Sequence, residues 1–272
     1  MEENLEHVLT EWSMEPSIWL GIALLVGVYL LATGPWRSRV KGSEPVPRAR
    51  RVSFVAGAFV MLIALASPLD HISDHYLFSA HMVQHLLLTL VAPPLMLIGT
   101  PGWMLRPFLR FKLVASIARL LTRPIVAFAL FNIVFSVWHA PALYQSALES
   151  EPIHIFEHLL FISTAFLNWW AILSPLAELP RLPYPGQILY LFLDAVPSTV
   201  LGAILVFASD VLYPTYASAP RIFGISALED QIYSGLIMAM PGGMAYLLAL
   251  SIVFFRWMGQ EDSTERRNAV AG

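Results

Sequence analysis

The stretch that decides the fold is SAHMVQHLLLTLVAPPLMLIG at residues 79–99, which contains no Asp, Glu, Lys or Arg. A helix of about 20 apolar residues crosses the hydrocarbon core of a bilayer, so this stretch predicts a membrane span. The whole chain agrees, because 57% of its 272 residues are apolar and only 13% are charged, against roughly 25% charged in a soluble domain. The chain has no cysteine, which excludes a disulfide scaffold and a thiolate metal site.

Six further stretches outside residues 79–99 have the same character. The seven spans are expected near residues 17–33, 52–69, 79–99, 124–143, 154–173, 186–209 and 230–257. We therefore predict an all-α membrane protein, a bundle of seven transmembrane helices, with one integral membrane domain filling residues 1–272. The apolar stretch 111–121 is short and carries Lys112 and Arg119, so we expect an amphipathic surface helix there.

Positive charge predicts the orientation of the bundle. The Lys and Arg residues follow the first, third, fifth and seventh spans, and only Arg221 lies on the other side. Cytoplasmic loops carry the excess of Lys and Arg, so we expect the N-terminus outside and the C-terminus in the cytoplasm. The segment before the first span is acidic and has no Lys or Arg, unlike a cleavable signal peptide. We therefore expect the first span to remain as an anchor.

All eight histidines fall on the predicted outer side. They are His7 in the N-terminal tail, His71 and His75 after the second span, His81 and His85 in the third, His139 closing the fourth, and His154 and His158 opening the fifth. Three pairs have a spacing of four residues, which on a helix places both imidazoles on one face. We expect His71 and His75 on a mobile loop and the later five on helices. Because imidazole is the commonest side-chain ligand of transition metals, these five predict a metal or haem site.

Two carboxylates and a methionine accompany the histidines. Glu157 lies inside a span, where a charge is costly and usually functional. Asp230 opens the seventh span and could orient an imidazole ligand or cap its helix. Met238 could bind Cu(I) as a soft ligand or simply pack in the core.

Two other chemistries are compatible with the pattern. Residues 154–158 spell H-x-x-E-H, the pattern of zinc proteases in which the Glu is the general base, so a zinc-dependent membrane protease is one alternative. Histidines on facing helices can also ligate haem iron. A haem-binding assembly factor or electron carrier is the second alternative, although the predicted cytoplasmic side offers no second pair of histidines.

Several motifs resemble the CtaG-type membrane family of cytochrome c oxidase assembly factors, the kind associated with caa-type oxidases. The first is His81-Met82-Val83-Gln84-His85 followed by Ala92-Pro93-Pro94, Gly99 and Pro101. Trp138-His139-x-Pro141 with Tyr144, His154-x-x-Glu157-His158, and Asp230-Gln231 with Met238 follow in the family's order. The resemblance covers nearly all of the predicted seven-helix region.

This resemblance implies an assembly factor and metallochaperone of respiratory chain biogenesis, not an enzyme, in the bacterial plasma (inner) membrane. Its cargo would be copper, as Cu(I) or Cu(II), bound on the periplasmic or exterior side and delivered to subunits of a haem–copper oxidase. A periplasmic or extracellular copper donor is implied as a further partner, and nucleic acid is not. By position, the implied copper ligands are His81, His85, His139, His154, His158, Glu157, Asp230 and Met238.

Overall fold

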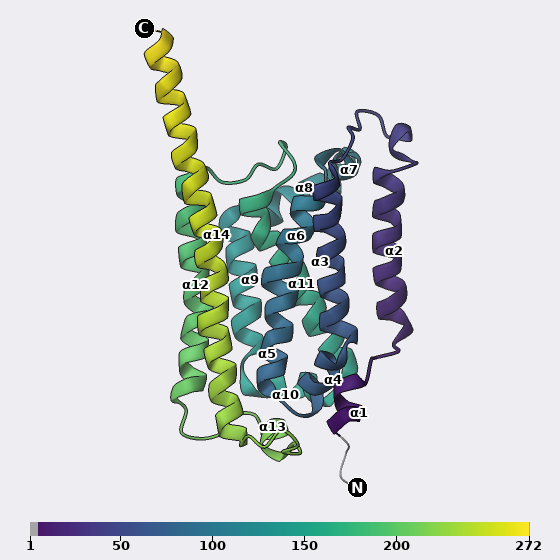
Figure 1. Cartoon of the computed structure of the whole chain (residues 1–272), viewed down its shortest axis with the longest axis vertical. Helices are drawn as coiled ribbons and strands as arrows, with labels where there is room; N and C mark the ends of the chain where they lie inside the picture. The colour runs from purple at the N-terminus through teal and green to yellow at the C-terminus, as the bar shows by residue number, and fades with distance from the viewer. Residues whose placement is uncertain (1–4, 272) are drawn as a thin grey trace.

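The computed structural model describes residues 5–271, with side chains through residue 261, and its regular structure in this part is entirely helical. The long helices run side by side (Figure 1). They are α2 (Pro16–Thr33), α3 (Arg48–Ala66), α5 (Phe78–Leu86) continued through η2 (Leu87–Val91) and α6 (Ala92–Gly99), α9 (Pro124–Trp138), α11 (Glu151–Leu173), α12 (Tyr184–Phe207) and α14 (Ala227–Ala271).

The predicted helical membrane protein is confirmed. Six helices of the described chain are long and apolar enough to cross a membrane, and there are seven if α9 is counted with α8 (Lys112–Leu121), from which it bends by 71°. The expected surface helix at 111–121 is thus α8, whose bend away from α9 separates it from the span.

The fourth span is shorter than predicted. Helix α9 ends at Trp138, and a separate helix α10 (Pro141–Glu149) follows. Ala140 has an extended backbone, because a residue before proline is disfavoured in the α conformation. The break leaves His139 at the end of α9, outside regular helix.

The short helices gather at the two ends of the bundle (Figure 1). At the end that carries the N-terminus lie α1 (Leu5–Thr10), α4 (Pro68–His75), α10 and α13 (Pro214–Ser218). The opposite end carries η1 (Arg37–Arg39), α7 (Gly102–Leu105) and η3 (Arg106–Arg110). The basic connections therefore lie at one end and the histidine-bearing helix ends at the other.

The expectation of a loop at His71 and His75 is wrong, because both lie on α4. Ser67 precedes this helix, and its hydroxyl accepts a hydrogen bond from the backbone N–H of Leu69 at 3.2 Å. Pro68 occupies the first helical position, where its missing N–H costs nothing. A serine cap followed by proline therefore starts a helix here.

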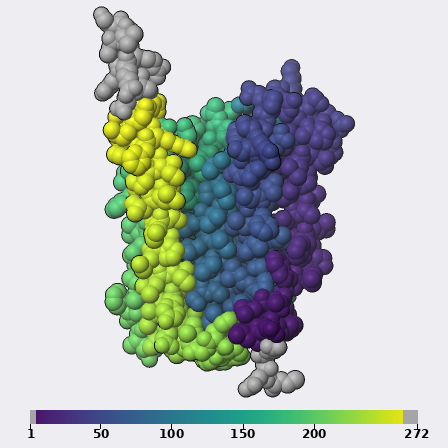
Figure 2. All heavy atoms as spheres, in the orientation of Figure 1, coloured from purple at the N-terminus to yellow at the C-terminus, as the bar shows by residue number. Residues whose placement is uncertain are grey.

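Helices α12 and α14 pack with their backbones in close contact. A Cβ atom on Gly202 would lie 2.6 Å from the carbonyl oxygen of Gly235, and one on Gly235 would lie 2.5 Å from that of Gly202. Only glycine allows this approach. In the face shown in Figure 2, α14 and α2 lie on opposite sides, with α5 and α3 between them.

Asp194 lies in the half of the bundle away from the histidines, buried in α12. Its two oxygens accept hydrogen bonds from the side-chain amides of Asn132, at 2.7 Å, and Asn168. The Tyr190 hydroxyl donates to the Asn168 carbonyl oxygen at 2.6 Å. The carboxyl group is thus satisfied within the bundle and joins α9, α11 and α12.

Candidate metal centre

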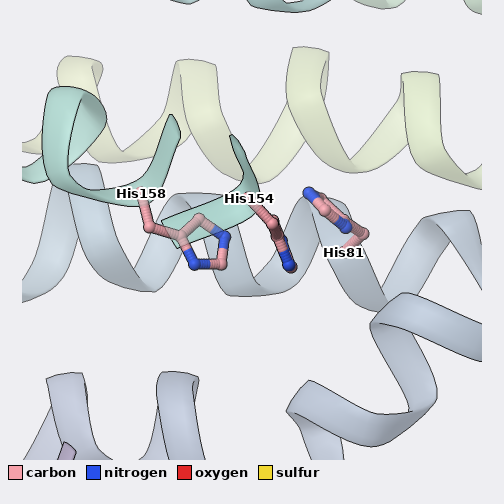
Figure 3. A group of neighbouring side chains, drawn as sticks. All are labelled: His81, His154 and His158. Atoms are coloured by element: carbon pink, nitrogen blue, oxygen red, sulfur yellow. The ribbon is translucent and has the colours of Figure 1, made fainter. Parts of the chain in front are cut away.

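Helices α5 and α11 bring four of the predicted histidines together. His81 and His85 lie one turn apart on α5, and His154 and His158 lie one turn apart on α11. Their ring centroids are separated by 4.2 Å within each pair and by 5.5 Å between His81 and His154. Figure 3 shows the rings of His81, His154 and His158 next to one another. We call the four side chains the imidazole cluster.

The cluster is largely buried and rich in polar atoms without partners. His81, His85 and Glu157 are at most 1% exposed, and His158 is 7% exposed. No hydrogen bond is made by Nδ1 of His85, by Nε2 of His154 or His158, or by either carboxylate oxygen of Glu157. Buried polar atoms are nearly always satisfied in folded proteins. Donor atoms orphaned together are therefore the observation expected where a metal ion completes the structure.

These donors form two groups that share one histidine. Ligand atoms of His81, His154 and His158 lie within 4.8 Å of one another, and so do those of His81, His85 and Glu157. The Nε2 atoms of His81 and His85 are 2.8 Å apart. Two nitrogens bound to one ion at 2.0–2.1 Å are separated by about 2.8–3.4 Å at square or tetrahedral angles. The spacing of the His81 and His85 nitrogens therefore matches that of two ligands on one ion.

His139 lies beside the cluster without joining either group. Its ring centroid is 5.8 Å from that of His85, and its Nδ1 is 2.6 Å from the carbonyl oxygen of Phe135. That contact makes Nδ1 the protonated nitrogen, because a carbonyl oxygen only accepts. The free Nε2 is buried and unpartnered, so His139 is prepared to act as a ligand but needs a small shift to reach a shared ion.

Tyr216, which the sequence did not single out, sets the tautomer of His81. Its hydroxyl donates to the carbonyl oxygen of Ser73 at 2.7 Å and lies 3.2 Å from Nδ1 of His81 and from the hydroxyl of Tyr144. Burial raises the pKa of Tyr216 well above 10, so the phenol keeps its single proton. That proton is used in the hydrogen bond to the carbonyl oxygen of Ser73. The Nδ1–H of His81 must then donate to Tyr216, which leaves Nε2 as the free ligand atom.

Asp230 is a cap, but for a different helix from the expected one. Its Oδ2 accepts from the backbone N–H of Phe78 at 2.7 Å, and its Oδ1 from that of Ser79 at 3.1 Å. These are the first backbone groups of α5, whose N–H groups have no partner within the helix. Both oxygens of Asp230 are thereby used, and it is fully buried. The residue orients α5, which carries His81 and His85.

Met238 packs in the core. It is 1% exposed and belongs to a hydrophobic cluster with Phe78, Met82 and Phe161. The backbone carbonyl of Met238 accepts a hydrogen bond from the Ser198 hydroxyl at 3.1 Å. This hydrogen bond joins α14 to α12.

Acidic side chains of α4 approach the cluster from the side. Oδ2 of Asp74 lies 3.5 Å from Nδ1 of His154. The Asp74 carboxylate thus faces Nδ1, while Nε2 is the nitrogen of His154 without a hydrogen bond. Burial raises the pKa of Asp74, and the neighbouring His154 opposes that rise. Burial, with the charge of Asp74, raises the pKa of Asp70 to about 7, and the hydrogen bond from Gln84 opposes it.

Gln84, in the middle of the H-x-x-x-H motif, fixes α5 against its neighbours. Its amide nitrogen donates to the carbonyl oxygen of Ala64 at 2.8 Å and to Oδ1 of Asp70 at 2.7 Å. Ser73 donates to its amide oxygen at 3.1 Å. Gln84 is fully buried. Its place between two histidines of an apolar span was the feature of the sequence that could have indicated this positioning role.

The remaining histidines lie away from the cluster. His71 and His75 stack on each other with ring centroids 4.8 Å apart. The Nε2 atoms of His71 and His7 lie 3.5 and 3.7 Å from the same oxygen of Glu11. This arrangement ties α1 to α4 and does not extend the imidazole cluster.

The family model for the cytochrome c oxidase caa3 assembly factors matches residues 27–260, which include the whole imidazole cluster. The chain belongs to this family. The resemblance inferred from the motifs is thereby confirmed, and the family is described as that of assembly factors for cytochrome c oxidase caa3.

Relatives of this chain occur in mycobacteria. An uncharacterised protein of Mycobacterium bovis is 23% identical over 281 residues, which cover 97% of this chain and 42% of the relative. One of Mycobacterium leprae is 22% identical over 275 residues, covering 95% and 41%. The chain thus spans about two fifths of the length of the curated relatives it matches. No solved structure matches it significantly.

Proposed function

We propose that this assembly factor binds copper in the imidazole cluster on the outer side of the plasma membrane and delivers it to the caa3-type oxidase. The observation that carries the proposal is the set of buried donor atoms without hydrogen bonds on His85, His154, Glu157 and His158, around the shared His81. Imidazole suits copper, and Cu²⁺ binds nitrogen ligands more strongly than the other first-row divalent ions.

The donor set also suits a carrier that must release its cargo. The cluster consists of neutral imidazoles with one carboxylate, and the chain contains no thiolate. Thiolates bind soft Cu(I) most tightly, so a site of this kind exchanges its metal more readily. His81 belongs to both ligand groups, which supports transfer by replacement of one ligand at a time.

The geometry supports a zinc protease or a haem protein less well than it supports copper binding. A zinc protease needs its general base to reach a water and a peptide, but Glu157 is fully buried and is grouped with His81 and His85 rather than with His154 and His158. Two axial haem ligands face each other across an iron in a porphyrin plane. His81 and His85, whose Nε2 atoms are 2.8 Å apart on one helix, cannot be such a pair.

Metal analysis of purified variants tests the proposal. Because His81 is shared by both groups and His158 contributes an orphaned nitrogen, His81→Ala and His158→Ala should each abolish tight copper binding. His7→Ala is the matched control, since His7 is 69% exposed and contacts Glu11 instead. Wild-type copper retention in both cluster variants would refute the shared site, and a Soret band in the purified protein would replace copper by haem.

The outward orientation of the site is tested by labelling. The chain has no native cysteine, so single cysteines can be introduced without a background. Cysteines near His75 or Glu151 should react with an impermeant thiol reagent applied to intact cells, whereas those near Arg48 or Arg181 should not. The reverse pattern would place the cluster on the cytoplasmic side.

A further inference from the structure

A cavity of about 850 Å³ lies at the histidine-bearing end of the bundle, directly beside the imidazole cluster. His154 and His158 form part of its wall, so the cavity reaches the cluster. Its charged lining residues come from several segments of the chain and are all acidic. They are Glu15, Asp70, Asp74 and Glu151, and no Lys or Arg occurs among the described residues that line it.

The polar groups along this cavity become steadily less exposed toward the cluster. Glu15 and Glu151 are exposed to solvent. The side chain of Asp74 is 25% exposed and that of His154 is 12% exposed, while His158 is 7% exposed and His81 is fully buried. From the surface inward, the polar groups therefore change from carboxylates to imidazoles.

His154 connects the two regions with its two nitrogens. Its Nδ1 faces the cavity carboxylate of Asp74 at 3.5 Å, whereas its Nε2 has no partner and its ring belongs to the group with His81 and His158. The second wall imidazole, His158, is more than nine-tenths buried and also has an unpartnered Nε2. Two vacant ligand atoms thus lie where the acidic cavity meets the cluster.

We propose that this acidic cavity is the route by which a hydrated metal cation passes between the outside and the imidazole cluster. This inference rests on the proposed function, since it assumes that the cluster binds copper. A cleft lined by one sign of charge concentrates ions of the opposite sign and accelerates their association. One water molecule takes up about 30 Å³ in the liquid, so the volume accommodates a cation that still carries its hydration shell.

Removing charge from the mouth of the cavity tests the route without touching the cluster. Glu15→Gln/Glu151→Gln replaces two exposed side chains, and Glu149→Gln/Asp210→Asn is a matched control, because it removes the same charge from exposed positions outside the cavity. Uptake of Cu²⁺, supplied as the hydrated ion, is followed by rapid desalting and metal analysis of the full chain. We expect about tenfold slower loading in the first variant at low salt, and no change in the control.

Salt and saturation complete this test. Added salt should slow loading of the wild type but hardly affect the variant, because screening acts on the same exposed charges, and both should reach the same final copper content. Equal loading rates in the wild type and the mouth variant would overturn the route, as would equal slowing in the control. A wild-type protein that takes up no copper would instead overturn the proposed function.

A blocking experiment tests the route independently of charge. Ser17 is exposed and lines the cavity, whereas Ser218 is exposed and does not. Each serine is replaced by cysteine and capped with a bulky maleimide before copper is added, so no free thiol remains. We expect the capped Ser17→Cys protein to load at least tenfold more slowly than the capped Ser218→Cys protein. Identical loading of the two would overturn the route.

Discussion

Replacing Asp230 separates its capping role from metal ligation. Asp230→Ala removes the acceptor of two backbone hydrogen bonds, from Phe78 at 2.7 Å and from Ser79 at 3.1 Å. A hydrogen bond to a charged group contributes roughly 1.5–3 kcal/mol, so the loss of both costs about 3–6 kcal/mol. Asp230→Asn keeps one acceptor oxygen and should cost about half as much.

The free energy of unfolding is measured in mixed micelles, together with the copper content of the folded fraction. Asp210→Ala serves as the control, because Asp210 is exposed and its side chain accepts a hydrogen bond from the adjacent Ser209 at 3.0 Å. A change within about 0.5 kcal/mol is expected there. Folded Asp230→Asn protein should retain its copper, since both carboxylate oxygens face α5. An Asn variant that is as stable as the wild type but lacks copper would refute the capping argument and make Asp230 a ligand.

Three other substitutions test the surroundings of the cluster. Tyr216→Phe removes the acceptor that orients His81 and should weaken copper binding by about 10–100-fold in a competition titration. Tyr190→Phe, in the polar group around Asp194, should leave the affinity unchanged. Equal affinities of the two variants would contradict the assigned tautomer of His81. Met238→Leu should keep all copper and lose less than about 1.5 kcal/mol, and loss of copper would show that sulfur binds it. Gly202→Leu should destabilise the folded protein by at least about 1–3 kcal/mol through overpacking, and an unchanged denaturation midpoint would contradict the close helix contact.

The fold and the histidine cluster could be predicted because both follow from spacing along the chain. Uncharged stretches of sufficient length predict the spans, and the spacing of His81 to His85 and of His154 to His158 places each pair on one helix face. That α5 and α11 bring their histidine pairs into contact was known only from the tertiary structure. Because these histidines were all predicted at the same end of the bundle, we could expect them to lie close together.

The positioning residues were not predictable in the same way. Asp230 binds the N-terminus of a helix that begins 152 residues earlier, and capping patterns in sequence detect only a residue's own helix. Tyr216 lies on α13, a helix of five residues, which is too short for a periodic pattern to relate it to His81. The break at His139, by contrast, could have been predicted from Pro141, because the residue before a proline avoids the helical conformation.

The capping of α5 by Asp230 also bears on the order in which the site matures during synthesis. Helix α14 is the last long helix of the described chain, and the start of α5 remains without its carboxylate partner until α14 has entered the bilayer. A nascent protein therefore displays its histidines well before it can hold them in place. The start of the helix that carries His81 and His85 thus gains its buried carboxylate cap only after α14 has packed against it.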